Sequence, residues 1–194
     1  MQLKERHQVL AYKDTSVDKE IVNSLVFRAI KHMPSKQRRR RVNITLIDTS
    51  IGRRKEIIYR TTLPQDPPEG YNPQILAPWV LAFGAREEAW DKEDVDREWF
   101  LQEVGIEIGF ISGYITLLAP ELGLGTGFCG CIHDTYGMNK ILGYHPMLFL
   151  GLGVEDPDAT EFYCYRDKKM MPIPYQVRNS RESEPDIEEF YKVI

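Results

Sequence analysis

The stretch EVGIEIGFISGYITLLAPELGLGTGFCG, residues Glu103–Gly130, decides the centre of the fold. Its first part belongs to a mostly apolar segment, Asp94–Ala119, which predicts a long helix in the core or in a large interface. Its second part places four glycines between Gly123 and Gly130, directly after that helix. So little side-chain bulk indicates either tight turns or a flat group that lies against the main chain.

The predicted long helix carries its own glycines at regular spacing. Gly105, Gly109 and Gly113 follow one another at intervals of four residues and therefore fall on nearly one face of a helix. A missing Cβ lets two backbones touch, so this face is expected to contact another helix closely.

Around this stretch the sequence alternates between helical and extended patterns. The helix Asp14–Met33 is expected to begin with Ser16 as its N-cap, and the prolines after Glu155 predict an irregular tail that wraps another surface. Spacing and β-branched content predict the remaining elements. These are strands at Val42–Asp48, Pro78–Ala85 and Pro146–Val154, a weaker helix at Ser50–Thr61, and a short helix within Ile132–Leu142 capped by Asp134.

Length and composition limit the possible classes. The 194 residues are expected to form one domain, and a net charge of −4 argues against nucleic acid as the main partner. The three cysteines, Cys129, Cys131 and Cys164, form neither a disulfide framework nor a zinc spacing and are interpreted as small core residues. We therefore expect a cytoplasmic protein with no metal, and the apolar runs are interpreted as too short to span a membrane.

Two basic segments leave alternatives open. Arg6 and His7 precede the first helix and are either plain surface residues or a grip on a phosphate. The run Arg38–Arg41 is either a solvated basic turn or a set of donors for an anion or an electron-rich ring. No hydrolase, phosphate-loop or zinc-protease pattern is present in the sequence, and the G-x-G within GLGTGFCG lacks the context of a dinucleotide fingerprint.

Taken in order, four segments and a continuation resemble the nitroreductase family of flavin enzymes across nearly the whole chain. The opening stretch is similar to the family's central helix followed by G-L-G-T-x-[WF]-x-G. The others are RHQVLAYKD at Arg6–Asp14, MPSKQRRRR at Met33–Arg41, YNPQILAPWVLAFGA at Tyr71–Ala85, and the continuation LGYHPMLFLGLG at Leu142–Gly153.

The resemblance implies an α+β fold of three layers, with a mixed, mainly antiparallel sheet between helices. It also implies an intertwined homodimer that holds FMN at its interface. Residues 1–194 would form one domain, with residues 155–194 as a tail reaching the partner subunit. The implied activity is an FMN-dependent oxidoreductase that takes electrons from NADH or NADPH and reduces a nitroaromatic, a quinone or a similar acceptor by a ping-pong hydride mechanism.

The resemblance also implies which residues hold the cofactor. No catalytic side chain is expected, because the flavin N5 carries the chemistry. The implied positions come from the N-terminus, the basic loop, the Asn turn, the Gly-rich strand and the tail. They are Arg6, His7, Gln8, Pro34, Ser35, Lys36, Arg38, Asn72, Phe128, Cys129, Gly130, and Arg166, Lys168 or Lys169 as the final phosphate cation.

Departures from the family pattern keep other functions open. Arg38 stands where the family usually has Asn, Arg40 where it has Gln, and Gln8 where it has Ser. Arg near the flavin would stabilise the anionic reduced ring or favour an acidic substrate. The alternatives are a specialised branch of the family, performing flavin fragmentation or reductive dehalogenation, and a non-catalytic flavin-binding dimer.

Overall fold

The computed structural model describes residues 7–34, 40–63, 72–91, 95–166 and 169–174. Its centre is a four-stranded sheet in the order β1-β2-β4-β3, and every strand pair in it is antiparallel. The expected α+β class is confirmed. The strands are β1 Val42–Asp48, β2 Trp79–Ala85, β3 Gly125–Cys129 and β4 Pro146–Gly153.

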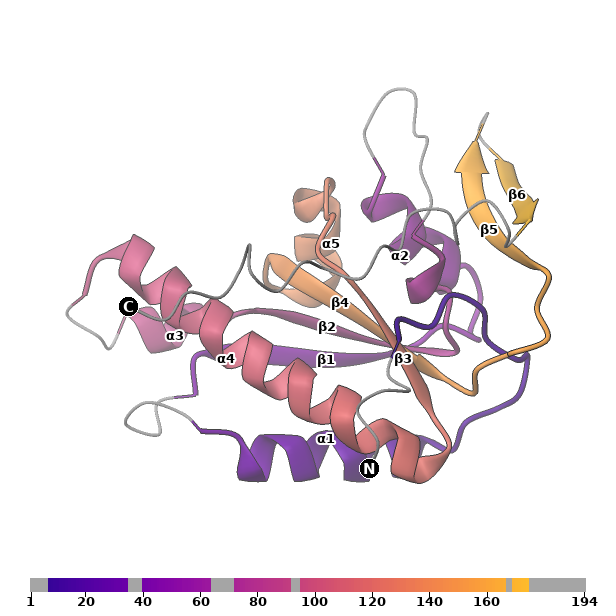
Figure 1. Ribbon diagram of the computed structural model, residues 1–194. Coiled ribbons are helices and arrows are strands. Elements are labelled where there is room, and N and C mark those ends of the chain that lie inside the picture. The colour runs from indigo at the N-terminus through magenta and orange to yellow at the C-terminus, as the bar shows by residue number, and fades with distance from the viewer. Residues whose placement is uncertain (1–6, 35–39, 64–71, 92–94, 167–168, 175–194) are drawn as a thin grey trace, which may run out of the picture.

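Helices cover both faces of the sheet, which gives the expected three layers (Figure 1). Side chains of β2 alternate between the two layers, with Leu81 and Phe83 on one side and Val80 and Ala82 on the other. The first side is covered by α1 Lys19–His32 and α4 Arg97–Leu118, and the second by α2 Arg54–Thr61 and α5 Thr135–Leu142. Three short elements complete this part of the chain: η3 Pro73–Ile75, α3 Glu87–Trp90 and η4 Ala119–Leu122.

Aspartates at the N-termini fix where the longer helices begin. The Asp18 carboxylate accepts a hydrogen bond from the Glu20 N–H at 2.9 Å, so the expectation of Ser16 as the cap of α1 was wrong. Asp134 was predicted correctly, since it accepts from the Gly137 N–H at 2.8 Å at the start of α5.

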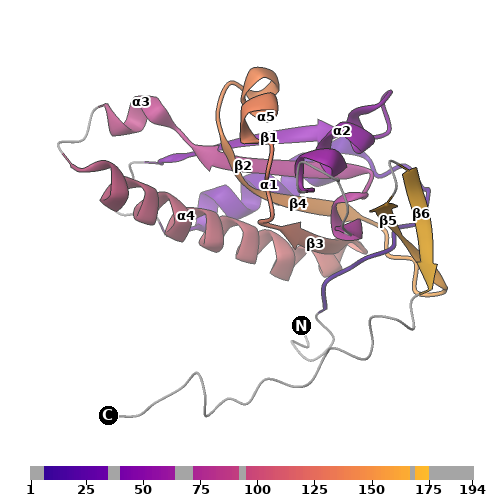
Figure 2. The ribbon, with the colours of Figure 1, turned by 90° about the horizontal axis from the view of Figure 1, so that it is seen from above.

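The chain after Glu155 is more regular than expected. β5 Glu161–Arg166 and β6 Lys169–Pro174 pair as an antiparallel hairpin, which lies at the opposite end of the molecule from α3 (Figures 1 and 2). The prolines at 172 and 174 are tolerated because β6 has a strand neighbour on one side only in the described part of the chain. The predicted reach of residues 155–194 toward a partner subunit stays a prediction, and residues 175–194 lie outside the described residues.

The helix α4 has two different faces. Phe100, Val104 and Ile111 lie in the core against the sheet, whereas Ile106 and Phe110 on the other face are 53% and 44% exposed. Together with η4, this helix is long and apolar enough to cross a membrane, judged by length and composition alone. The sequence-based expectation that the apolar runs are too short to span a membrane overlooked it. A single helix of this kind is weak evidence for a membrane span, and its inner face packs in the core.

The glycines of α4 lie on its exposed face. A Cβ built at Gly105, Gly109 or Gly113 would meet no atom of the described chain within 4 Å. The close helix contact predicted from this spacing is therefore not made with the described part of the same chain. As a contact with a second copy it stays a prediction.

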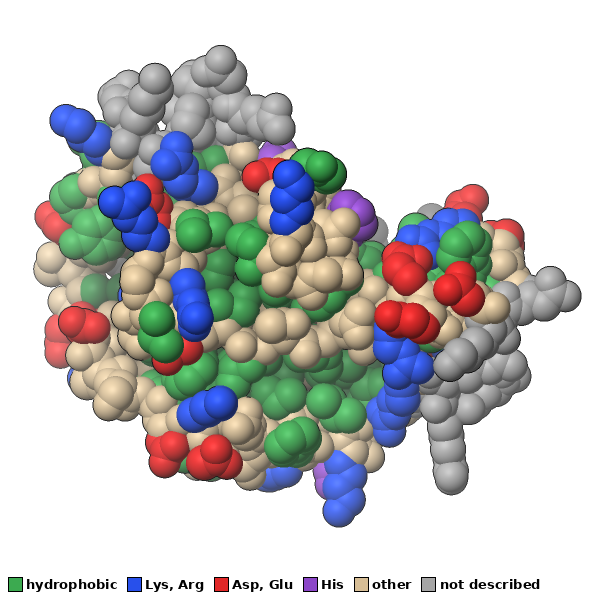
Figure 3. Space-filling view, turned by 180° about the vertical axis from the view of Figure 1, so that it is seen from behind, with side chains coloured by type: hydrophobic (Ala, Val, Ile, Leu, Met, Phe, Trp, Pro, Cys, Tyr) green, Lys and Arg blue, Asp and Glu red, His purple; other side chains and the backbone are tan. Residues whose placement is uncertain are grey.

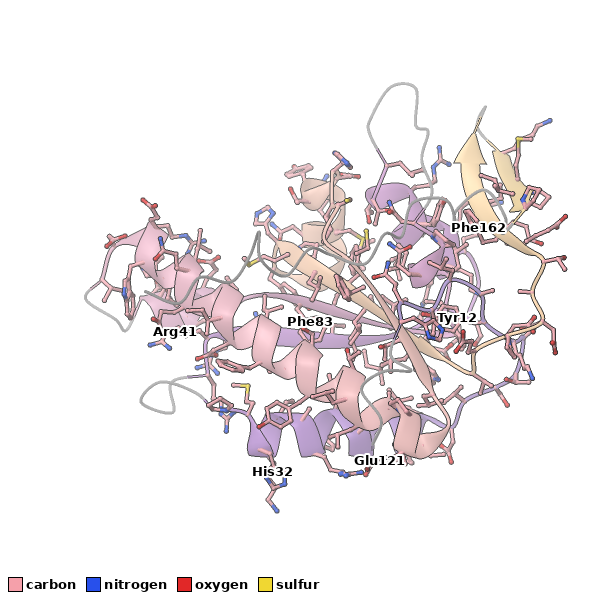
Figure 4. All side chains as sticks on the ribbon, in the orientation of Figure 1. Tyr12, His32, Arg41, Phe83, Glu121 and Phe162 are labelled. Carbon is pink, nitrogen blue, oxygen red and sulfur yellow. The ribbon has the colours of Figure 1, made fainter. Side chains whose placement is uncertain are left out.

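The second half of the basic run Arg38–Arg41 is structural. Arg41 is fully buried, and its guanidinium lies 3.1 Å from Glu107 Oε1 and 3.8 Å from Glu103 Oε2, both on α4. Figure 4 shows Arg41 at the end of the sheet beside α4. Arg40 has a left-handed backbone, with φ at 48°, and donates to the Ile30 carbonyl near the end of α1 at 2.9 Å. These two arginines join the start of β1 to both helices of one layer.

Charged side chains are spread over the surface seen from behind. Lys and Arg alternate there with Asp and Glu around a centre rich in hydrophobic side chains (Figure 3). The described residues on this face therefore form no single basic field of the kind that phosphate backbones require.

Candidate functional site

Three segments that are distant in the sequence meet on one face of the edge strand β3. The Val9 N–H donates to the Thr126 carbonyl at 2.9 Å, which lays the N-terminal segment along the strand. A Cβ at Gly127 would overlap with Gln74 of η3 and would lie 2.5 Å from the Val9 carbonyl oxygen. The N-terminal segment, the Asn72–Gln74 turn and β3 therefore form one cradle, which we call the β3 cradle.

The β3 glycines have a different role from the expected one. The space next to Gly125 is filled by the Val9 side chain, and the space next to Gly127 by Gln74 and the Val9 carbonyl. Their small size therefore accommodates the chain's own segments rather than leaving a bare ribbon for a flat ligand. Gly130 differs, because a Cβ there would meet no described atom within 4 Å. The open part of the β3 cradle lies at this end of the strand.

His7, one of the residues predicted to bind the phosphate, lies at the rim of the cradle. His7 Nε2 lies 2.6 Å from Glu155 Oε1, and both side chains are partly exposed. An isolated bridge between Tyr12 and Glu155 ties the same segment to the chain beyond β4, and the Tyr12 hydroxyl donates to the Gln74 carbonyl at 2.9 Å. Burial raises the pKa of Tyr12 above its usual range, with the nearby Glu155 charge as a second cause. Tyr12 is therefore a neutral fixed support, while Gln8 follows His7 directly and Arg6 lies outside the described residues.

Asn72 is in the cradle but its amide is already engaged. Its Nδ2 donates to the carbonyl and to the hydroxyl of Thr62, at 3.1 Å and 3.0 Å. Its Oδ1 accepts a long hydrogen bond of 3.4 Å from Gln74 Nε2. A ligand that needs the Asn72 donor would have to compete with Thr62 at the end of α2.

The end of β3 presents three different groups. The Phe128 side chain is 52% exposed, whereas Cys129 is only 3% exposed and belongs to the second core layer with Ile75 and Met138. Burial raises the pKa of the Cys129 thiol to about 11. The expectation that the cysteines are small core residues is correct for Cys129 and wrong for Cys131, which is exposed. No group of three or more metal-ligating side chains was found among the described residues.

Other predicted site residues lie elsewhere in the chain. Pro34 lies in the segment between α1 and β1, and β1 is the edge strand on the opposite side of the sheet from β3. Figure 4 shows His32, at the end of α1, far from Tyr12. Lys169 begins β6 at the turn of the hairpin and pairs in register with Arg166. Ser35, Lys36, Arg38, Lys168 and the side chain of Arg166 lie outside the described residues.

Gln74, which connects the segments of the cradle, was not identified from the sequence. Gln74 contacts β3, accepts from Tyr12 through its carbonyl and bonds to Asn72. One signal was available in the sequence, since Gln74 is a polar residue inside an otherwise apolar run after Pro73.

A cavity of about 370 Å³ adjoins the cradle beneath the hairpin. Tyr12 forms part of its wall together with Phe162, and Figure 4 shows these two residues at the same end of the molecule. Lys55, Asp156 and Glu161 supply its charged groups. It is large enough for a small organic molecule.

A scan against models of protein families and a search of curated proteins found no match. Solved structures do match. A nitroreductase family protein from Streptococcus pneumoniae is 15% identical, with a TM-score of 0.67, and the match covers 98% of this chain and 97% of that one. The chain has the nitroreductase fold.

Two longer proteins share this fold. Nitroreductase A from Vibrio parahaemolyticus is 15% identical with a TM-score of 0.63, and the match covers 78% of this chain but only 64% of that protein's chain. The NADPH:FMN oxidoreductase from Vibrio harveyi, solved in complex with NAD⁺, is 14% identical with a TM-score of 0.63 and coverage of 95% and 78%. At such identities the likeness concerns the fold, which agrees with the architecture expected from the sequence.

Proposed function

We propose that this protein is an FMN-dependent oxidoreductase of the cytoplasm that uses NADH or NADPH to reduce a nitroaromatic, a quinone or a similar acceptor. The observation that carries the proposal is the match of 98% of the chain to a solved nitroreductase family protein. The name of the Vibrio harveyi neighbour supports FMN and a nicotinamide donor. When bound, FMN would supply the two-electron chemistry, and the protein would supply orientation and electrostatics.

The β3 cradle fits one edge of such a cofactor. It offers open space at Gly130, an exposed aromatic ring at Phe128 and polar groups at His7 and Asn72. Main-chain N–H and C=O groups near Gly130 would bond the ring edge, and His7 with Gln8 would approach the phosphate end. Pro34, which follows α1, would contribute to the site of the other subunit. The remaining cations predicted from the tail and the basic loop would complete the phosphate contact.

Reconstitution with FMN tests the proposed function. We expect the purified protein to bind FMN with a flavin absorbance spectrum, and the bound flavin to bleach when NADPH is added without oxygen. Asn72→Ala should weaken FMN binding about fivefold if the side chain turns from Thr62 to the ring, since one hydrogen bond contributes about 1 kcal/mol. Asn139→Ala, on α5 outside the cradle, is the matched control.

Each outcome of that titration has a defined meaning. A protein that remains colourless with added FMN contradicts the proposal. Bound FMN that is never reduced by NADH or NADPH would instead support the non-catalytic flavin-binding dimer. Unfolding curves of both asparagine variants separate weaker binding from a general loss of stability.

The second subunit would cover the exposed face of α4. This face combines Ile106 and Phe110 with Gly105, Gly109 and Gly113, whose bare backbone admits a second helix at short range. Such a face, apolar and free of close contacts within the described chain, is typical of an interface between copies. The proposal is therefore a homodimer formed through α4.

Gly109→Ala is expected to stabilise the protein if the outer face of α4 is exposed to solvent, and to weaken the dimer if a second subunit covers that face. In a single chain the added methyl meets open space, and alanine favours helix by about 0.5–1 kcal/mol, so the free energy of unfolding would rise. In a dimer packed on this stripe the methyl separates the two backbones, and we expect dissociation at a higher protein concentration than for the wild type. Sedimentation measures the dissociation, and urea titration measures the stability.

Ser24→Ala on the exposed side of α1 is the matched control, because it improves helix propensity away from the stripe. It should leave the oligomeric state unchanged. A wild-type protein that sediments as a single chain at every concentration would contradict the dimer.

A further inference from the structure

The end of β3 places two thiols one residue apart, one buried and one accessible. The buried Cys129 Sγ donates a weak hydrogen bond to the Cys131 carbonyl at 3.9 Å, and both thiols are free. The two groups are therefore neighbours in space and differ in access to solvent.

The two cysteines are joined by Gly130, and a short turn follows that allows a small movement of the backbone. The Ile132 N–H donates to the Gly130 carbonyl at 3.0 Å, which marks a three-residue turn centred on Cys131. Gly130 has open space where a side chain would be, so its backbone can adjust. Beyond the turn, the N–H groups of His133 and Asp134 both donate to the Thr61 carbonyl, at 2.7 Å and 3.1 Å. The chain is thus anchored directly after residue 132.

We infer that Cys129 and Cys131 form a reversible intramolecular disulfide when the protein meets a small-molecule disulfide. In the first step the Cys131 thiolate attacks one sulfur of the oxidant, forming a mixed disulfide and releasing one thiolate. In the second step Cys129 loses its proton to solvent and attacks the Cys131 sulfur, which expels the second thiolate. Two protein thiols are oxidised and one disulfide is reduced to two thiols.

Access and burial set the order of these steps. Cys131 is exposed and reacts first, whereas Cys129 is shielded from any large oxidant. Burial raises the pKa of Cys129 to about 11, so near neutral pH its thiol is protonated. As long as the pH is below that pKa, each increase of one pH unit raises the thiolate fraction of Cys129 about tenfold. The ring-closing step should accelerate by the same factor.

The disulfide would change the surroundings of Gln74 and Asn72 in the candidate site. Gln74 also acts on the Cys129 thiol, since it lowers the pKa that burial raises, and Gln74 in turn bonds to Asn72. Drawing Cys129 toward Cys131 would move the thiol relative to Gln74. The inference itself does not depend on FMN, because it concerns two thiols of the protein alone.

The test uses the full-length Cys164→Ser protein, in which only these two thiols remain, treated with oxidised glutathione. We expect a mass decrease of about 2 Da in the whole protein, a linked peptide containing both residues, and full reversal by a dithiol reductant. In a Cys129→Ser variant of the same protein the glutathione adduct on Cys131 should accumulate instead. Closure in the parent should be faster at about pH 9 than at about pH 7.

Three results would overturn the inference. They are a glutathione adduct on Cys131 that persists in the parent across this pH range, a product in which two chains are joined through Cys131, and, in the wild type, a disulfide to Cys164. Circular dichroism checks that the serine variants fold. If Cys164→Ser does not fold, peptide mapping of the oxidised wild-type protein decides between the same pairings.

Discussion

Replacing Arg41 with methionine is expected to lower the free energy of unfolding by about 3–5 kcal/mol. The guanidinium is fully buried, and its partner Glu107 is only 3% exposed. Glu107 also accepts from the Arg41 backbone N–H at 2.8 Å, so the arginine satisfies both carboxylate oxygens of a helix that faces the core. Methionine fills a similar space but leaves Glu107 as a buried charge without this cation. Denaturant titration followed by circular dichroism measures the loss.

Two variants show whether the effect comes from the unpaired charge. Arg41→Met combined with Glu107→Leu removes both charges, and we expect most of the lost stability to return. Arg60→Ala breaks an exposed pair with Glu56 and should change stability by no more than about 0.5 kcal/mol. If the double variant is as unstable as Arg41→Met, the packing of the arginine rather than its charge holds this corner together.

Gly127→Ala is expected to cost about 1–3 kcal/mol and to disturb the β3 cradle. The new methyl would overlap with the Gln74 side-chain base and lie 2.5 Å from the Val9 carbonyl oxygen. Neither neighbour is the free end of a flexible side chain, so the N-terminal segment would have to move off β3. Because His7 and Gln8 precede Val9, FMN binding should weaken together with stability.

Gly130→Ala, three residues further on, is the matched control. A methyl there meets no described atom, and the variant should keep its stability within about 0.5 kcal/mol. Unfolding curves of the two variants provide the comparison, and the FMN titration is made on Gly127→Ala. Equal losses in both variants would contradict the argument from close approach.

Local patterns predicted those parts of the fold that local forces decide. The strand Val42–Asp48 was predicted with its exact bounds, because alternation and β-branched residues coincide there with pairing to β2. The start of α1 was placed too early because several possible caps follow one another before it. A distant contact decides among them: the Trp79 indole donates to the Val17 carbonyl at 2.9 Å and Val17 is buried, so the helix begins only after Asp18.

Long-range contacts explain what could not be predicted. The burial of Arg41 depends on acids of α4 some 60 residues away, so a basic run before a strand gave no sign of it. The partners of Gly125 and Gly127 come from the N-terminal segment and from η3. The candidate site was predicted by family resemblance. The structure places Val9, which follows His7 and Gln8, and Gln74, which bonds to Asn72, against β3. Its assignment as a cofactor site stays a prediction.

The two-sided nature of α4 has a consequence for how the protein responds to dilution. Its inner face holds Phe100, Val104 and Ile111 in the core, so the core cannot unfold without releasing this helix. If a second copy covers the outer face as proposed, every association event also stabilises the fold by mass action. The melting temperature would then rise with protein concentration, and folding and assembly would be one coupled equilibrium.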